Sequence, residues 1–316
     1  MSEKNNNLAF VFPGQGSQSV GMLSAMAESF PIITQTFEQA SDVLSFDLWK
    51  MVQNGPVEDL NQTHNTQPAM LAAGVAMWRV WCEQSSTRPA WVAGHSLGEY
   101  TALVNSGSIK FEDGVKLVAE RGRLMQEAVP VGVGAMAAII GLDDQQVIDV
   151  CAESAGNEIV AAVNFNAPGQ VVIAGHDGAV EKAMAAAKEA GAKRALKLPV
   201  SVPSHCALMK SAAEKLFENL QAIEIAVPEM TLIHNVDVES HKEASAIANA
   251  LKEQLFKPVR WVDSVKYMNE QEVTHFVECG PGKVLMGLNK RIVKAADHMT
   301  MYDPATLEKV LEQLNG

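Results

Sequence analysis

The chain has 316 residues, of which 47% are hydrophobic, and its 25 Lys and Arg against 37 Asp and Glu give a formal charge of -12. This length and apolar content provide a core for one large domain, or for a large domain with a smaller one, and exclude disordered and collagen-like chains. The acidic balance, without a run of more than two basic residues, argues against nucleic acid or an anionic membrane surface as the main partner.

The cysteines and the N-terminal segment bear on the compartment. The cysteines have neither a CxxC pair nor metal-ligand spacing, so we interpret them as reduced thiols: Cys82, Cys151, Cys206 and Cys279. The apolar run Leu8–Phe12 is too short for a signal peptide, and no stretch reaches the roughly 20 apolar residues of a membrane-spanning helix. We therefore expect a cytoplasmic protein, without a metal or another cofactor.

The first part of the chain alternates short apolar runs with segments of helical spacing. Leu8–Phe12 and Trp91–Ala93 predict buried parallel strands, each of which runs into a loop that contains glycine. Helices are predicted over about 22–53, 67–83, 99–105 and 111–128, the second with Pro68 near its first turn.

A different order begins near Pro130. A strand, a helix, two strands, a helix and a last strand are predicted at 134–141, 143–155, 159–165, 170–174, 178–190 and 195–200. This β-α-β-β-α-β order is the split βαβ, ferredoxin-like pattern, and it predicts a small inserted domain at 129–201.

The earlier alternation returns after the insertion. Helices are predicted at about 208–222 and 244–255, and strands at 231–233 and 275–278. We therefore expect an α/β fold in which an α/β-hydrolase-like large domain with a parallel sheet, formed by 1–128 and 202–316, carries the ferredoxin-like small domain.

Gly94-His95-Ser96-Leu97-Gly98 matches the pattern G-x-S-x-G between a predicted strand and a predicted helix. Chance gives about 0.1 such matches in a chain of this length, before any demand on the flanking structure. In this context the glycines permit a sharp turn that exposes the serine as a nucleophile, and the following N–H stabilises developing negative charge. The alternative is a glycine-rich turn with a helix-capping serine, which the context disfavours.

A serine nucleophile needs a base, and histidine is the usual choice. His205 follows a strand and a proline turn, which makes it the best of several candidates by position alone. His95 is expected to point away, and the other histidines are interpreted as surface residues: His64, His176, His234, His241, His275 and His298. No Asp or Glu between Ser96 and His205 stands out as the orienting acid, a role that a backbone carbonyl could also fill.

Two further positions attract attention. Gln15, between Gly14 and Gly16, suits a second oxyanion donor, although a phosphate-binding turn or a simple tight bend would use the same residues. The glycine spacing there does not fit a dinucleotide-binding motif. Arg121 lies near the end of an amphipathic helix, where an arginine is usually a solvated charge.

Six motifs in this order resemble those of the malonyl-CoA:acyl carrier protein transacylases. The resemblance covers about residues 8–295. The motifs are Gly14-Gln15-Gly16-Ser17-Gln18, Gly94-His95-Ser96-Leu97-Gly98, Arg121-Gly122 with Met125-Gln126, Pro203-Ser204-His205, Asn235-Val236-Asp237 and Gly280-Pro281-Gly282.

The resemblance implies a role for each of six residues. Ser96 would be the nucleophile and His205 its base, with the backbone amides of Gln15 and Leu97 as the oxyanion hole. The backbone carbonyl of Gln254 would orient His205, which explains why no acid is visible. Arg121 would bind the malonyl carboxylate, since a guanidinium can meet a carboxylate with two parallel hydrogen bonds. One departure is Ser204, where malonyl-selective domains of modular synthases often carry an aromatic residue.

The implied reaction is a ping-pong transfer of malonyl from malonyl-CoA to the phosphopantetheine thiol of acyl carrier protein, in fatty acid synthesis. The carrier of this family is acidic, so an acidic monomeric enzyme would dock it on local basic residues: Lys193-Arg194 with Lys197, or Lys283, Lys290-Arg291 and Lys294. The main alternative is a serine thioesterase or hydrolase of the α/β-hydrolase type. A second is a catalytically silent acyl-CoA-binding or scaffold protein.

Overall fold

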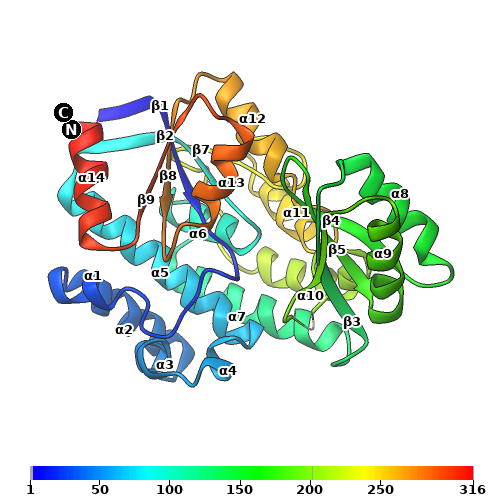
Figure 1. Cartoon of the computed structure of the whole chain (residues 1–316). Coiled ribbons are helices and arrows are strands. Elements are labelled where there is room, and N and C mark those ends of the chain that lie inside the picture. Colours follow the sequence, from blue (N-terminus) through cyan, green and yellow to red (C-terminus); the bar gives the residue numbers. More distant parts are fainter. Residues whose placement is uncertain (1–2, 201, 316) are drawn as a thin grey trace.

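The computed structural model describes residues 3–200 and 202–315, which form two separate β-sheets with helices around them (Figure 1). Ser201, at the end of the predicted insertion, lies outside the described residues, as do the outermost residues of the predicted large domain: Met1, Ser2 and Gly316. None of the helices in the described ranges has both the length and the apolar character that a membrane span requires.

The larger sheet has five parallel strands in the order β7-β2-β1-β8-β9. The strands are β1 (Glu3–Phe12), β2 (Thr87–Gly94), β7 (Thr231–Ile233), β8 (His275–Cys279) and β9 (Asp297–Met301). In the central strand β1, each side chain of Leu8–Phe12 is fully buried, because helices cover both faces of the sheet. The prediction of an α/β fold with a parallel sheet is therefore confirmed.

The helices of this part of the chain precede, connect and follow these strands. They are α1 (Ser24–Ser29), α2 (Ile32–Leu44), α3 (Leu48–Asn54), α4 (Val57–Leu60), α5 (Thr63–Gln84), α6 (Leu97–Asn105), α7 (Phe111–Ala128), the short 3-10 helix η1 (Ala207–Met209), α10 (Lys210–Gln221), α11 (Ala244–Gln254), α12 (Trp261–Glu270), α13 (Val284–Ile292) and α14 (Pro304–Asn315). The helices α5, α6 and α7 pack on one another, and Arg121 of α7 thereby lies close to Ser96 at the start of α6.

The helical spacing over about 22–53 corresponds to three helices, α1 to α3, whose boundaries the pattern does not mark. Pro31 precedes α2, and Ser45 ends it in the left-handed conformation with φ 60°. Asp47 then caps α3, where its side chain accepts from the N–H of Lys50 at 2.8 Å. The helix α5 begins four residues earlier than expected, so Pro68 lies inside it.

Several elements have no counterpart in the prediction. The polar start of β1, Glu3–Asn7, pairs with the start of β2 near the end of the sheet, where no apolar run marks a strand. The edge strand β9 pairs with β8 as its one neighbour in the five-stranded sheet, and its residues are mostly polar. The helices α12 to α14 are different, since their apolar residues do recur at helical spacing; in α12, Trp261, Val265 and Met268 are all fully buried.

The smaller sheet is antiparallel, with the strand order β4-β5-β3-β6. Its elements follow the predicted sequence of strand, helix, two strands, helix and strand: β3 (Gly134–Ile140), α8 (Asp144–Ala155), β4 (Val160–Ala167), β5 (Gln170–His176), α9 (Asp177–Glu189) and β6 (Arg194–Lys197). Figure 1 shows this green sheet with α8 and α9 on its outer side. Its apolar side chains, such as Val171, Ile173 and Ala183, form a cluster of their own.

The carboxyl ends of β1, β2 and β7 lie side by side, because the three strands are parallel neighbours. The loops that leave these strands carry residues 13–16, 95–96 and 234–235. Ligand sites in open parallel sheets form at this edge, so the topology collects three of the sequence motifs at one place.

Candidate active site

Ser96 lies on a strained turn between β2 and α6. Its φ of 52° and ψ of -107° are angles that residues with a side chain rarely adopt. The turn is tightly packed: a Cβ on Gly94 would lie 1.8 Å from the carbonyl carbon of Gly98, and a Cβ on Gly98 would lie 2.0 Å from the carbonyl oxygen of Phe12. The side chain of Ser96 makes no capping bond to α6, so the alternative of a helix-capping serine is wrong.

His205 faces Ser96, with 2.8 Å between the Nε2 of the histidine and the Oγ of the serine. Its other ring nitrogen, Nδ1, lies 2.6 Å from the backbone oxygen of Gln254 at the end of α11. A carbonyl oxygen can only accept, so Nδ1 carries the proton and Nε2 accepts from the serine hydroxyl. The backbone N–H of His205 donates to the oxygen of Leu255 at 2.9 Å, which fixes the histidine against the same segment.

The surroundings of His205 favour its neutral form. The residue is only 3% exposed. Burial, and secondarily the positive charge of Arg121, lower the pKa of His205 to about 3, against the opposing effect of the Gln254 carbonyl. The imidazole is therefore an available proton acceptor at neutral pH.

Arg121 reaches the same serine from α7. Its Nη2 donates to the Oγ of Ser96 at 3.1 Å and to the Oε1 of Gln254 at 3.0 Å, and its Nη1 donates to the Oε1 of Gln67 at 2.9 Å. The guanidinium also lies 5.2 Å from the ring of Tyr100. Arg121 is fully buried, so the expectation that a helix arginine is solvated is wrong here, and burial lowers its pKa.

Gln15 and Leu97 lie where two strand ends meet. Leu97 is the first residue of α6, and Gln15 lies in the loop after β1. The two loops touch, since a Cβ on Gly14 would lie 2.5 Å from the carbonyl oxygen of His95. Within residues 3–200 and 202–315, no hydrogen bond is found for the backbone N–H of either residue. Both N–H groups are thus unpaired in this part of the chain, at the place where the two loops touch.

The remaining histidines take no part in this cluster, with one exception. His95 points away as expected, and its Nε2 lies 2.7 Å from the Oδ1 of Asn166 in β4. The interpretation of His234 as a surface residue is wrong, because its side chain is fully buried and contacts Glu99. His234 adjoins the residues that hold the serine.

Three residues of the site carry no role in the sequence-based interpretation: Gln67, Glu99 and Asn235. Gln67 and Glu99 are fully buried polar side chains, and Thr66 in α5 and Thr101 in α6 are buried near them. Polar residues among the apolar positions of a helix are a signal that the sequence does contain. Asn235 belongs to a quoted motif and accepts from the backbone N–H of Ser96 at 2.7 Å.

The geometry and the comparisons with known proteins agree on the class of protein. The acyl transferase domain family matches residues 9–307, and the chain belongs to this family. Its curated relatives include the malonyl CoA-acyl carrier protein transacylases of Escherichia coli K12 and Bacillus subtilis. The first is 57% identical over 304 residues, 96% of this chain and 98% of the relative, and the second is 44% identical over 98% of each.

Solved structures extend the likeness to the fold. An acyl carrier protein S-malonyltransferase from Vibrio cholerae has a TM-score of 0.94 and 56% identity, over 96% of this chain and 99% of that one. A malonyl-transacylase solved in complex with a type II PKS acyl-carrier protein has a TM-score of 0.96 and 55% identity, over 97% and 99%. The resemblance to the malonyl-CoA:acyl carrier protein transacylases is therefore confirmed.

Proposed function

We propose that this chain transfers the malonyl group of malonyl-CoA to the phosphopantetheine thiol of acyl carrier protein, through a malonyl ester of Ser96, and so supplies fatty acid synthesis. The observation that carries the proposal is a buried guanidinium beside an activated hydroxyl: Arg121 and His205 both contact the Oγ of Ser96. An acyl group that carries its own carboxylate suits this pairing of nucleophile and cation.

In the first half-reaction, the Oγ of Ser96 attacks the thioester carbonyl while the Nε2 of His205 takes the hydroxyl proton. The backbone N–H groups of Gln15 and Leu97 stabilise the oxyanion; one such donor contributes about 100- to 1000-fold in rate. The C–S bond then breaks, and the CoA sulfur leaves with the proton that His205 returns. The enzyme is left as the malonyl ester of Ser96.

In the second half-reaction, His205 takes the proton of the phosphopantetheine thiol, whose sulfur attacks the ester carbonyl. The same N–H groups stabilise the second oxyanion. The C–O bond breaks, Ser96 recovers its proton from His205, and malonyl leaves on the carrier. The carbonyl of Gln254 keeps the histidine in one tautomer through both halves, in the place of an acid.

The malonyl carboxylate is assigned to Arg121 throughout. The guanidinium donates to neutral groups, the side chains of Gln67, Gln254 and Ser96. A malonyl carboxylate would give the guanidinium a charge-assisted partner, which these neutral side chains do not provide. An acetyl group has no carboxylate and cannot do so. This role makes the arginine a selectivity device as well as a binding group.

We also propose a domain assignment for each of the two sheets. We assign the parallel sheet with its serine turn to an α/β-hydrolase-like large domain, 1–128 and 202–316, and residues 129–201 to a ferredoxin-like small domain. The strand order β4-β5-β3-β6, the order of elements and the separate apolar cluster support the second assignment.

Docking of the carrier is assigned to exposed basic residues near the two sheets. Lys197 pairs with Asp177 and Glu181, and Arg291 donates to Pro168, so both are partly engaged. The other candidates are exposed: Lys193, Arg194, Lys283, Lys290 and Lys294. A monomer in the cytoplasm completes the proposal, and the cited neighbour with a bound acyl-carrier protein supports docking of such a partner here.

The test is to incubate the protein with malonyl-CoA and measure its intact mass, then to add carrier protein that bears phosphopantetheine. A malonyl adduct located on Ser96 that moves to the carrier supports the proposal, with Ser96→Ala as the control that forms no adduct. An adduct that is lost rapidly to water before carrier is added would show a hydrolase instead. No adduct at all would contradict both enzymes.

A further inference from the structure

Glu99 lies in the first turn of α6, and its side chain is fully buried behind the serine turn. Its carboxyl oxygens accept three hydrogen bonds: from the Nδ1 of His234 at 2.7 Å, from the backbone N–H of Asn235 at 3.0 Å and from the Nε2 of Gln254 at 2.8 Å. Burial of a carboxyl group is costly unless such partners satisfy it. Its three partners are therefore the place to look for its role.

Two of these partners hold the backbone of Ser96. The Oδ1 of Asn235 accepts from the N–H of the serine at 2.7 Å, and its Nδ2 donates to the carbonyl of Gly94 at 2.7 Å. The Nε2 of Gln254 donates to the carbonyl of the serine at 3.0 Å. Both polar groups of the strained residue are thus fixed by side-chain amides. Glu99 bonds the amide of Gln254 directly, and it holds Asn235 through the backbone N–H of that residue.

Gln254 also links Glu99 to the reacting groups. Its backbone oxygen contacts the Nδ1 of His205 at 2.6 Å, and its side-chain Oε1 accepts from Arg121 at 3.0 Å. Because the Nε2 end of the amide faces Glu99, the oxygen end must face the guanidinium. The carboxyl group therefore decides which way round this amide lies.

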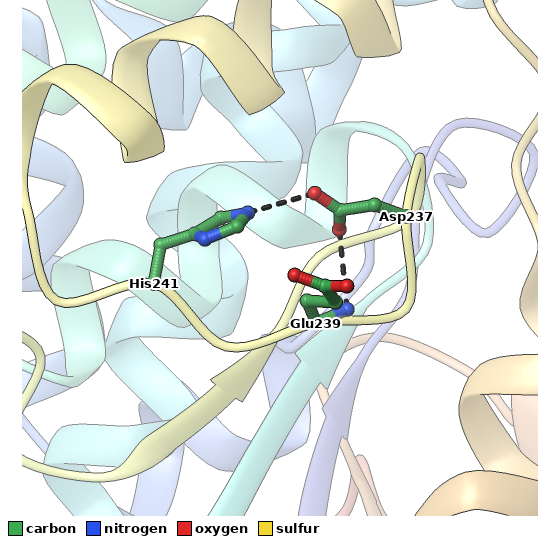
Figure 2. A group of neighbouring side chains, drawn as sticks. All are labelled: Asp237, Glu239 and His241. Carbon is green, nitrogen blue, oxygen red and sulfur yellow. Dashed lines mark hydrogen bonds and ion pairs between the residues drawn. The ribbon is translucent and has the colours of Figure 1, made fainter.

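The third partner, His234, belongs to a tightly closed loop. Its backbone N–H donates to the oxygen of Glu239 at 3.0 Å, and its ring lies 5.0 Å from the ring of His241. Figure 2 shows the outer side of this loop, where Asp237 contacts the Nε2 of His241 at 2.7 Å and the backbone N–H of Glu239 at 3.1 Å. The loop that carries His234 is thus closed by its own hydrogen bonds, while the ring of His234 bonds the carboxyl group of Glu99.

We propose that Glu99 is the positioning acid of this site, in place of an acid at the Nδ1 of His205, where the structure has the backbone oxygen of Gln254. Glu99 does not contact Ser96, His205 or Arg121 itself. It acts through Asn235 and Gln254, which align the backbone of the serine, the histidine and the arginine. The inference rests on the proposed function only in its use of Ser96 as nucleophile. A misplacement of about 1 Å in such a site can cost about 100-fold in rate, so loss of this carboxyl group should slow acylation.

The variants are Glu99→Ala and Glu99→Gln, with His234→Ala and His234→Asn on the partner side. Two rates are measured for each: single-turnover acylation by malonyl-CoA, and labelling of Ser96 by a fluorophosphonate, which needs no malonyl group. We expect Glu99→Ala to slow both by about 100-fold and Glu99→Gln by about tenfold, while the malonyl-CoA concentration at half-maximal rate changes less than about threefold. His234→Asn, which keeps a donor for Glu99, should stay near the wild-type rate, while His234→Ala loses about tenfold.

Leu103→Ala is the matched control, because Leu103 is fully buried in the same helix and its side chain has no polar atom that could join these hydrogen bonds. It should lower the melting temperature and leave both rates unchanged. If Glu99→Ala does not fold, Glu99→Gln carries the test. A Glu99→Gln protein with wild-type rates, or equal slowing by Leu103→Ala at equal loss of melting temperature, overturns the proposal. Wild-type protein that reacts with the fluorophosphonate but not with malonyl-CoA contradicts the proposed function alone, and labelling still decides the role of Glu99.

Discussion

The Nη2 of Arg121 donates to the Oγ of Ser96 at 3.1 Å, so the buried cation of the site directly contacts the serine that we propose as the nucleophile. In the described ranges 3–200 and 202–315, no carboxylate forms an ion pair with this guanidinium, although a buried charge usually has such a partner. The site therefore holds a buried positive charge beside Ser96 whose nearest acid, Glu99, is reached only through the side chain of Gln254.

Arg121→Ala should reduce malonyl transfer by about 100-fold or more, because each charge-assisted hydrogen bond contributes about 1.5–3 kcal/mol and a carboxylate can form two. Transfer of acetyl from acetyl-CoA should hold or rise, since acetyl has no carboxylate to lose. Steady-state assays of both acyl donors, with carrier protein as the acceptor, measure the ratio.

The control for this substitution lies two residues further along α7. Arg123 is half-exposed and pairs with Glu120 and Glu127 on the helix surface. Arg123→Ala should leave both activities within about twofold of wild type, as expected for a surface ion pair. A parallel loss of malonyl and acetyl transfer in Arg121→Ala would falsify the carboxylate-binding role.

The rate at which Ser96 reacts should fall at low pH only well below the ordinary histidine pKa of about 6.5. We call this fall the acid limb of the pH profile. Burial and the charge of Arg121 lower the pKa of His205 to about 3, so the imidazole stays neutral as the pH falls from 8 to 5. The rate of fluorophosphonate labelling of Ser96 should not change over that pH interval. In Arg121→Ala the acid limb should move to higher pH, because the positive charge that lowers the pKa of His205 is removed. A wild-type limb centred near pH 6.5 would contradict this environment for His205.

The same shift makes stability depend on pH with a definite sign. Below pH 6.5 the unfolded chain binds a proton at His205 that the folded protein does not, so stability falls as the pH is lowered. Between pH 6.5 and 5 this single group removes about 2 kcal/mol, from about 1.4 kcal/mol per pH unit. Urea unfolding of wild type and His205→Gln at pH 7 and pH 5 isolates the effect, because all other groups titrate in both proteins.

Sequence reasoning reaches the parts of this site whose chemistry is marked by spacing. The motif Gly94-His95-Ser96-Leu97-Gly98 can be recognised in the sequence because each glycine is required by a close backbone contact. The strand before it and the helix after it also have clear hydrophobic patterns. The role of the Gln254 carbonyl cannot be predicted from sequence patterns, because every residue has a backbone oxygen. Only the fold brings this oxygen to the ring of His205. The motif resemblance, and no property of the segment itself, pointed to it.

The burial of charged and polar residues is the other part that local pattern misses. Arg121 and His234 are of residue types that usually lie at the surface, yet both are fully buried, and partners from distant segments bond the Nη atoms of Arg121 and the Nδ1 of His234. Within residues 3–200 and 202–315, no hydrogen-bond partner is found for the Nε of Arg121 or the Nε2 of His234. The edge strand β9 is missed for the opposite reason: it needs few apolar residues, since only one neighbouring strand pairs with it. Tertiary contacts decide both cases.

Gly98→Ala should abolish acylation and destabilise the protein, because the new Cβ would lie 2.0 Å from the carbonyl oxygen of Phe12. Gly287→Ala is the matched glycine substitution. Gly287 lies inside α13 with nothing within 4 Å of an added Cβ, so alanine should stabilise the helix by about 0.5–1 kcal/mol and spare activity. Thermal unfolding and the intact-mass assay distinguish the two, and an active Gly98→Ala protein would show that the tight turn is dispensable.

Reversal of charge at the basic residues should separate the two half-reactions. Lys290→Glu with Lys294→Glu, and Lys193→Glu with Arg194→Glu, are each expected to slow transfer to carrier protein by about tenfold, and more at low salt than at high, because they change long-range attraction. Exchange of malonyl between CoA molecules, which needs only the first half-reaction and its reverse, should stay unchanged. Lys309→Glu on α14, also exposed, controls for the change in net charge. A pair whose reversal slows both reactions equally is not a docking site, and a pair that slows neither lies outside the interface.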